Sequence, residues 1–225
     1  MDRNSFSIGY VDSLDAMWND EQEFLFTMSS KTARQAIACG NWEKDFPSGH
    51  TGPHAMARMA YSDTHLYVCW HMRSNGLRAL HATDLSPVAQ EHCVEFFVQL
   101  PGEKTYWNFE VNALGTLNAS HRVERPCPTR LTGEQLRAVR RHGSHVGLRP
   151  FEIKEEPTAW WVAIAIPWSL IGVTAGELPR YLRGNLYACA GGIDHPYYLS
   201  RFPITTPRPD FHRPDFFGTI HLLPS

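Results

Sequence analysis

Apolar runs of strand length recur along the chain, and Gly, Pro, Asp and Asn separate them. Runs rich in β-branched and aromatic residues, bounded by turn-forming residues, predict β-strands. Many strands with short turns favour an all-β fold, a sandwich with a jelly-roll-like arrangement of strands and one or two short helices. The six clearest candidate strands are His65–Met72, Cys93–Leu100, Tyr106–Ala113, Ala159–Ile166, Asn185–Ala190 and Phe217–Leu222.

Some of these runs alternate strictly between apolar and polar residues, which predicts that only one face of the sheet packs on the core. Glu95 lies between Val94 and Phe96, so it should point away from the core. The other face should then meet solvent or a ligand. In the next run the two alternating sets are Trp107, Phe109, Val111 and Asn108, Glu110, Asn112.

Helical signals are few. Thr132 with Gln135 has the spacing of a capping box and predicts a short helix that ends near Gly143. Its arginines, among them Arg140 and Arg141, should form a solvated face. A further helical turn is expected near residues 14–19. No repeat or linker divides the chain, so residues 1–225 are expected to form a single domain.

Composition narrows the range of partners and compartments. A net charge of −2 gives no reason to expect nucleic acid or an anionic membrane. No apolar run is long enough to span a bilayer. The first residues do not resemble a signal peptide, which predicts an intracellular protein or one whose leader was removed. Cys69, Cys93 and Cys189 lie in apolar runs and should be buried free thiols, which favours a reducing compartment.

Four segments in series resemble carbohydrate-binding module family 9, and especially its stand-alone branch. The resemblance implies a β-sandwich that holds a mono- or oligosaccharide end between two aromatic rings, with polar groups from neighbouring strands and sometimes structural calcium. It also implies a xylan- or cellulose-binding role in polysaccharide utilisation. The segments are Glu91–Val98, Tyr106–Gly115, Trp161–Trp168 and Pro209–Gly218.

The resemblance places a stacking aromatic at Phe211, within a turn-forming stretch. An aromatic ring can cover the C–H face of a pyranose, while polar side chains take its hydroxyls. We therefore expect Phe211 to stand exposed at the rim of the sandwich, with His212 and Arg213 as donors to the sugar. The alternative is a ring that only closes the end of the core.

The remaining candidates depart in part from the family pattern. Glu95 and Asn112 match positions of polar contacts, whereas Glu110 stands where the family archetype has a basic residue. Arg201 stands where many relatives carry Trp. The second stacking ring is not evident, and Trp107 is one side chain that could supply it.

Other functions stay open at this point. Glu95 and Glu110 on neighbouring strands could form the carboxylate pair of a glycoside hydrolase. A module that serves assembly and has lost its sugar site would explain the missing aromatic. The twelve histidines lack a compact metal-ligand spacing. Calcium could take loop oxygens such as those of Asp12, Asp15 or Asp63. The expected function is nonetheless sugar binding without catalysis and without a required cofactor.

Overall fold

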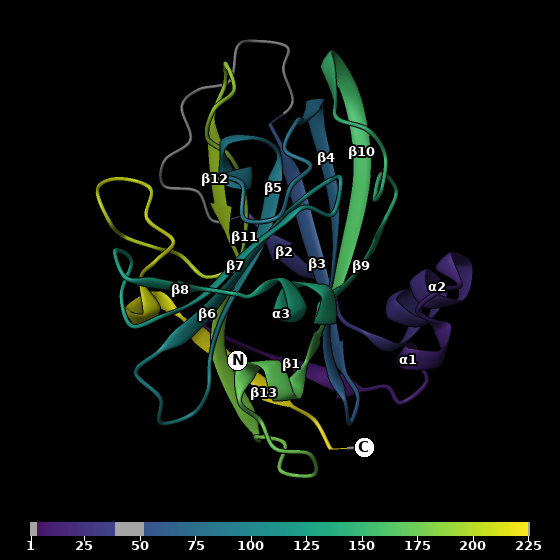
Figure 1. Ribbon diagram of the computed structural model, residues 1–225, viewed down its shortest axis with the longest axis vertical. Coiled ribbons are helices and arrows are strands. Elements are labelled where there is room, and N and C mark those ends of the chain that lie inside the picture. The colour runs from purple at the N-terminus through teal and green to yellow at the C-terminus, as the bar shows by residue number, and fades with distance from the viewer. Residues whose placement is uncertain (1–3, 39–51, 225) are drawn as a thin grey trace.

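The computed structural model describes residues 4–38 and 52–224, so Cys39 lies outside the described residues (Figure 1). The helices are α1 Leu14–Met17, α2 Glu21–Lys31 and α3 Gly133–Ala138, with short 3-10 turns at Val88–Gln90, Trp168–Ile171 and Pro214–Phe216. The strands are β1 Ser5–Tyr10, β2 Gln35–Ile37, β3 His54–Tyr61, β4 His65–Ala79, β5 Cys93–Gln99, β6 Tyr106–Asn112, β7 Leu117–Arg122, β8 Pro128–Arg130, β9 Arg140–Gly143, β10 Phe151–Pro167, β11 Tyr181–Ala190, β12 Tyr197–Ser200 and β13 Gly218–Leu222. All six predicted strands are confirmed.

The strands form a curled sheet with the order β8-β7-β6-β5-β11-β13-β1-β3-β4-β10-β9, in which β12 adds to β11 and β2 adds to β3. Strand β1 joins the two halves. Its first part pairs in parallel with β13, from Ser5 opposite Thr219, and its last two residues pair in parallel with β3. The two halves face one another as the layers of a sandwich, which confirms the predicted fold class (Figure 1).

The main core lies between the two layers and follows the predicted alternation. Phe109 and Val111 point inward from β6, where they meet Trp70 and Val68 of β4 in one apolar cluster. Trp107 is partly buried at the edge of this cluster. Each inward side chain removes apolar surface from water, which is the main contribution to stability.

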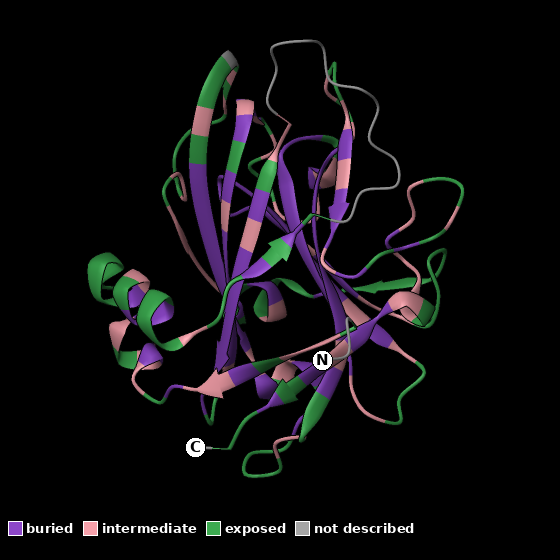
Figure 2. Cartoon of the chain, turned by 180° about the vertical axis from the view of Figure 1, so that it is seen from behind, coloured by how far each residue is buried: buried purple, intermediate pink, exposed green. Residues whose placement is uncertain are grey.

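The outer face of the β3–β4–β10 layer is also buried, because α1 and α2 cover it (Figure 2). Phe24 and Met28 of α2 pack with Tyr67 and Trp161 of the sheet. The sequence predicted only one helical turn in this region and missed α2. Phe26 is 69% exposed and interrupts the apolar stripe that would have indicated a helix.

The outer face of the β5–β6–β11 layer is covered by residues 201–217, here called the covering segment. Its Phe211 and Phe217 form a second apolar cluster with Phe97, Tyr106 and Tyr187 of the sheet. The sequence predicted that this face would meet solvent or a ligand, with no segment of the chain packed over it. That prediction is wrong, because strand alternation shows which side chains share a face but not what the rest of the chain lays over it.

The helix α3 begins as predicted and ends earlier. Thr132 accepts a hydrogen bond from Gln135 N at 3.3 Å, and the side chain of Gln135 accepts from Thr132 N at 2.9 Å, which completes the capping box. The chain leaves the helix at Val139 and continues as β9. Arg140 pairs with Asp15, and Arg141 donates to Asp84 at 2.8 Å. The predicted solvated face is therefore wrong for these two arginines.

The predicted burial of Cys69, Cys93 and Cys189 as free thiols is confirmed. Each lies at 1% exposure or less, within a strand. None of the described helices is both long and apolar enough to cross a membrane.

Candidate functional site

Several of the predicted site residues gather on the covered outer face of β5, β6 and β11. The strand register places Glu95 of β5 opposite Glu110 of β6 and opposite Tyr187 of β11. Phe211 and His212 of the covering segment pack against the same face. The structure therefore brings together Glu95, Glu110, Phe211 and His212, as the resemblance implied.

Phe211 is buried rather than exposed, which contradicts the prediction. Its ring lies 4.2 Å from that of Tyr187 at an interplanar angle of 14°, and Tyr198 meets it edge-on at 6.2 Å. The hydroxyl of Tyr187 also donates to the carbonyl of Phe211 at 3.2 Å. Only 8% of Phe211 is exposed, so the face that would receive a sugar is occupied by Tyr187.

The two carboxylates beneath the covering segment are buried as well, against the expectation of a wet face. Glu110 accepts from the amides of Asn108 at 2.9 Å and Asn118 at 2.8 Å. Glu95 accepts only from the thiol of Cys189, at 3.2 Å. Burial raises the pKa of both carboxyl groups, and that of Glu95 lies well above its ordinary value.

The two neighbours of Phe211 differ in role. His212 hydrogen-bonds Tyr106 at 3.0 Å and lies 4.8 Å from the ring of Phe97. Burial, together with nearby arginines, lowers the pKa of His212 to about 3, so it is neutral. Arg213 is partly exposed, and its guanidinium donates hydrogen bonds of 3.0 and 2.5 Å to the carboxylate of Asp215. Neither residue lines the open pocket described below.

Asn112 uses its side chain to hold the turn after β6. Its amide donates to Glu91 at 2.6 Å and to the carbonyl of His81 at 2.8 Å. Its carbonyl oxygen accepts from the backbone of Leu114 and Thr116. With both donors and the acceptor engaged, Asn112 shapes the turn and has no group left for a ligand.

Arg201 and Trp107 lie apart from the covered face. Arg201 donates to Gln35 at 3.0 Å and stacks on the rings of Phe6 and Phe202. Trp107 stacks on His121 at 4.2 Å, on the inward side of its strand. The structure does not bring either of them beside Phe211 as a second stacking ring.

Two of the three loop aspartates considered for calcium, Asp15 and Asp63, already have protein partners. Asp15 is engaged by the cation Arg140, by His65 at 3.0 Å and by the hydroxyl of Thr64. Asp63 accepts from Tyr10 at 3.1 Å. Calcium needs six to eight oxygens and no competing cation at the carboxylate, which this arrangement does not supply.

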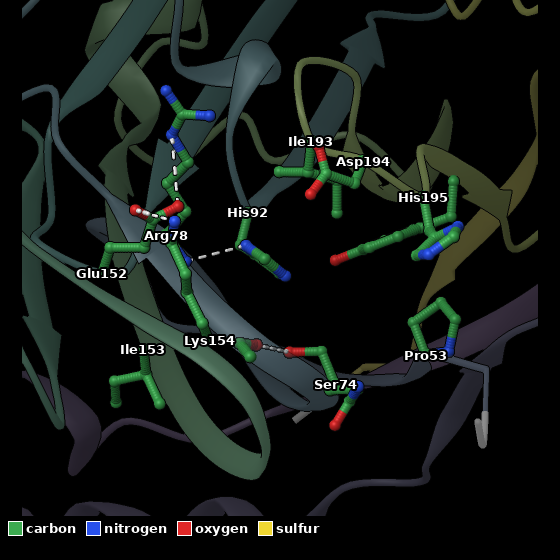
Figure 3. Close-up of a pocket in the computed structure, with 13 residues that line it drawn as sticks. Pro53, Ser74, Arg78, His92, Glu152, Ile153, Lys154, Ile193, Asp194 and His195 are labelled. Carbon is green, nitrogen blue, oxygen red and sulfur yellow. Dashed lines mark hydrogen bonds and ion pairs between the residues drawn. The ribbon is translucent and has the colours of Figure 1, made fainter. Parts of the chain in front are cut away.

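An open pocket lies at one end of the sandwich, beside the covered face. It has a volume of about 460 Å³, within the ordinary range of small-ligand sites. Its walls come from the β4 and β10 strands near their paired ends and from the loop between β11 and β12 (Figure 3). The polar and charged residues of its lining include Arg78, His92, Glu152, Lys154, Asp194 and Tyr197.

Two aromatic side chains of this pocket carry buried polar atoms without a partner. Nδ1 of His92 accepts from the backbone N–H of Arg78 at 3.0 Å, so the neutral ring carries its hydrogen on Nε2. Nε2 is buried and makes no hydrogen bond within the described structure. The ring points into the pocket (Figure 3). Burial lowers the pKa of His92 to about 4.

Tyr197 shows the same pattern. Its hydroxyl is buried and makes no hydrogen bond in the described structure, and its ring lies 6.0 Å from that of His92. Burial raises the pKa of Tyr197 well above its ordinary value, so the hydroxyl keeps its hydrogen. Two neighbouring residues that line one cavity thus each carry a buried donor without a partner among the described residues.

The charges around the pocket balance. Arg78 donates to the carbonyl of Gly192 at 3.1 Å and lies 4.0 Å from Glu152, which also lies 3.7 Å from Lys154. Asp194 supplies a second carboxylate on the loop. Two cations and two carboxylates leave the wall without net charge, which suits an uncharged polar ligand.

The sequence pattern did not predict this pocket. Its residues come from five separate stretches of chain, and His92 directly precedes an apolar run, so nothing in its local sequence marks it as a site residue. A local signal is the pair Gly191 and Gly192, where an added Cβ would lie 2.8 Å from the hydroxyl of Tyr198 and 2.7 Å from the carbonyl oxygen of Gln90. That close approach fixes the loop that closes the pocket.

Comparison with known proteins gives a consistent result. The family model for carbohydrate-binding family 9 matches residues 21–222. The crystal structure of a proposed carbohydrate-binding protein from Bacteroides uniformis ATCC 8492 is 27% identical, with a TM-score of 0.83, over 98% of this chain and 99% of that one. No match was found among the curated proteins.

Two further solved structures share the fold at low identity. Both are of a carbohydrate-binding module family 9 from Caldicellulosiruptor kristjanssonii. The complex with glucose is 13% identical, with a TM-score of 0.57, and the alignment covers 97% of this chain and 95% of that one. The complex with cellotriose is 14% identical, with a TM-score of 0.52, over 97% and 93%. At this identity the likeness shows the fold alone.

Proposed function

The chain belongs to carbohydrate-binding family 9, and we propose that it binds an uncharged sugar or glycan end in the open pocket without cleaving it. The membership supports sugar binding in general. The proteins with which it shares a fold bind glucose and cellotriose. The position of the site is our inference from the pocket.

The unpartnered donors of His92 and Tyr197 carry this proposal. A buried polar group without a partner costs about 1–3 kcal/mol, so a ligand that supplies acceptors recovers that energy. Sugar hydroxyls accept and donate hydrogen bonds at short spacing, and the two rings offer apolar surface to the C–H groups. The balanced charges favour a neutral sugar over a uronic acid.

A hydrolase is less well supported. The pair Glu95 and Glu110 lies beneath the covering segment, and neither residue lines the pocket. Glu110 is held by two amides, and a glycosidase needs carboxylates on both sides of a bound glycosidic bond. A second candidate, an assembly module without its own sugar site, is favoured by one observation: Phe211 stacks on Tyr187 where the resemblance implied a sugar.

Isothermal titration calorimetry with glucose, cellotriose, xylose and glucuronate tests the proposal. We expect heat from at least one neutral sugar and weaker binding of glucuronate. Tyr197→Phe removes one donor and should weaken binding about tenfold, which corresponds to about 1.4 kcal/mol. Tyr198→Phe is the matched control, since Tyr198 contacts Phe211 on the covered face.

Two results would count against the pocket. The first is an equal loss of affinity in both tyrosine variants. The second is the absence of heat from every neutral sugar, which would favour the assembly module. Release of reducing ends from xylan or cellulose by the wild-type protein would instead establish the hydrolase.

A further inference from the structure

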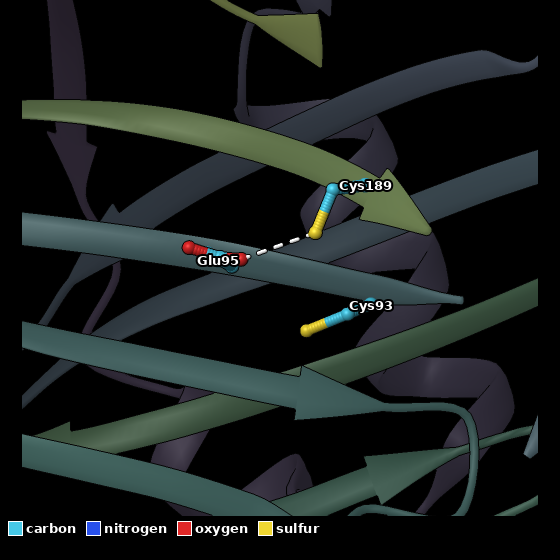
Figure 4. Close-up of side chains that lie close together, drawn as sticks. All are labelled: Cys93, Glu95 and Cys189. Atoms are coloured by element: carbon cyan, nitrogen blue, oxygen red, sulfur yellow. Dashed lines mark hydrogen bonds between the residues drawn. The ribbon is translucent and has the colours of Figure 1, made fainter. Parts of the chain in front are cut away.

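A compact group of two thiols and one carboxylate lies between β5 and β11 (Figure 4). The strand register places Cys93 opposite Cys189, and Glu95 follows two residues later on the same face. One ligand atom from each residue lies within 4.8 Å of the other two. All three side chains are buried, at 3% exposure or less.

From this geometry we propose that Cys93, Glu95 and Cys189 bind a soft divalent cation of the zinc class. Zinc takes thiolate sulfur and carboxylate oxygen as ligands, and three protein ligands leave a fourth position for water or another donor. Magnesium and calcium prefer sets made of oxygen alone, so two sulfurs select against them. This site is separate from the sugar pocket and does not depend on it.

The distances suit such an ion. With zinc–sulfur bonds of about 2.3 Å and zinc–oxygen bonds of about 2.1 Å, tetrahedral ligand atoms lie roughly 3.5–3.8 Å apart. The sulfur of Cys189 is already 3.2 Å from a carboxylate oxygen of Glu95. The three residues are held on two paired strands, and their ligand atoms all lie within 4.8 Å of one another.

The metal-free group holds protons that an ion would displace. Burial raises the pKa of Cys93 and of Glu95 well above their ordinary values, and the thiol of Cys189 donates to Glu95. Binding therefore releases protons, and the affinity should rise with pH. Two thiolates and a carboxylate around a divalent ion carry one net negative charge. The cation Arg125, whose charge already acts on Glu95, offsets part of it.

The other buried thiol in the described chain provides a control. Burial raises the pKa of Cys69 to about 12, and the nearest polar side chain is that of His71, at 3.7 Å. Cys69 is not part of a three-ligand group, and the cation Arg58 acts on it electrostatically. It matches Cys93 and Cys189 in burial but lacks their neighbours.

Cobalt serves as the probe, because thiolate ligands give Co²⁺ an intense charge-transfer absorption. We expect the reduced full-length protein to bind one Co²⁺ with this absorption, and Zn²⁺ to remove it by displacement. Cys93→Ala and Cys189→Ala should abolish it, whereas Cys69→Ala should retain it. Glu95→Gln should weaken Co²⁺ binding at least tenfold. Apparent affinity should increase from pH 6 to pH 8.

The covering segment lies over the site, so the titration is repeated on protein refolded from urea with Co²⁺ present. Circular dichroism and a thiol count establish that each sample is folded and reduced. Absence of the absorption in both preparations overturns the proposal. Its persistence in Cys93→Ala and Cys189→Ala, or its loss in Cys69→Ala alone, does so as well.

Discussion

The covered face and the open pocket contain the same kinds of residue and differ in what those residues contact. On the covered face Phe211 stacks on Tyr187, and Glu110 has an amide on each carboxylate oxygen. In the pocket the donors of His92 and Tyr197 have no partner among the residues that the structure describes. Around Phe211 and Glu110 the first region is complete without a ligand, whereas the second is not.

The difference shows that residue types alone do not distinguish a sugar site from a closed core. Aromatic rings and carboxylates are typical of both. What separates them is whether each buried polar group is satisfied, because an unsatisfied one costs free energy that only a ligand or water can recover. The prediction with the largest expected effect therefore concerns a side chain of the covered face.

Phe211→Ala should destabilise the protein by about 3 kcal/mol, because it removes a buried ring stacked on another. Urea unfolding followed by Trp fluorescence measures the loss. Sugar affinity measured on the folded variant should change less than twofold, since the ring does not line the pocket. Loss of sugar binding with an unchanged melting temperature would contradict our choice of the pocket and identify Phe211 as the ring that stacks on the sugar.

The two buried histidines, one in each region, should make stability depend on pH. The pKa of His92 lies at about 4 and that of His212 at about 3, against an ordinary value of 6.5. Both are neutral in the folded protein, so their contribution is fully present above pH 6.5 and is lost as pH falls toward these values. Between pH 7 and pH 5 the loss is on the order of 2 kcal/mol for each.

Urea midpoints at several pH values measure this dependence, and the variants His92→Gln and His212→Gln assign it. Each variant should lose stability less steeply between pH 7 and pH 5 than the wild-type protein. A saturating neutral sugar should protect the wild-type protein through the pocket. If neither variant alters the slope, both imidazoles are more hydrated than their burial indicates.

Arg213→Ala should have the smallest effect. Water screens the pair of Arg213 with Asp215, so the pair contributes little to stability and the melting temperature should hardly change. Sugar affinity should also be unchanged, since Arg213 does not line the pocket. A clear loss of affinity would place the sugar against the covering segment and contradict our choice of site.

The sequence was sufficient to predict the fold because the alternation in β5 and β6 is set by local chemistry. Phe109 and Val111 had to face a core, whichever strand lay opposite them. The helix α2 was not predicted, because the exposed Phe26 interrupts its apolar stripe. The end of α3 was misjudged because Val139 continues its apolar pattern into a strand.

The candidate site could be predicted only in part. The shared face of Glu95 and Glu110 followed from alternation, but the covering segment is placed by contacts more than a hundred residues apart in sequence, such as His212 with Tyr106. The role of Asn112 depends on Glu91 and on a carbonyl at residue 81, which no local pattern reveals. The pocket needs His92 and Tyr197 to meet across two loops.

The parallel pairing of β1 with β13 has a mechanical consequence. The two described ends of the chain leave these strands at opposite ends of their ladder, from Ser5 opposite Thr219 to Ile8 opposite Leu222. A pulling force on the two ends therefore acts along the strands in shear, and all the hydrogen bonds between β1 and β13 bear it together. Under such a pull the sandwich resists as a whole, because the bonds cannot open one after another.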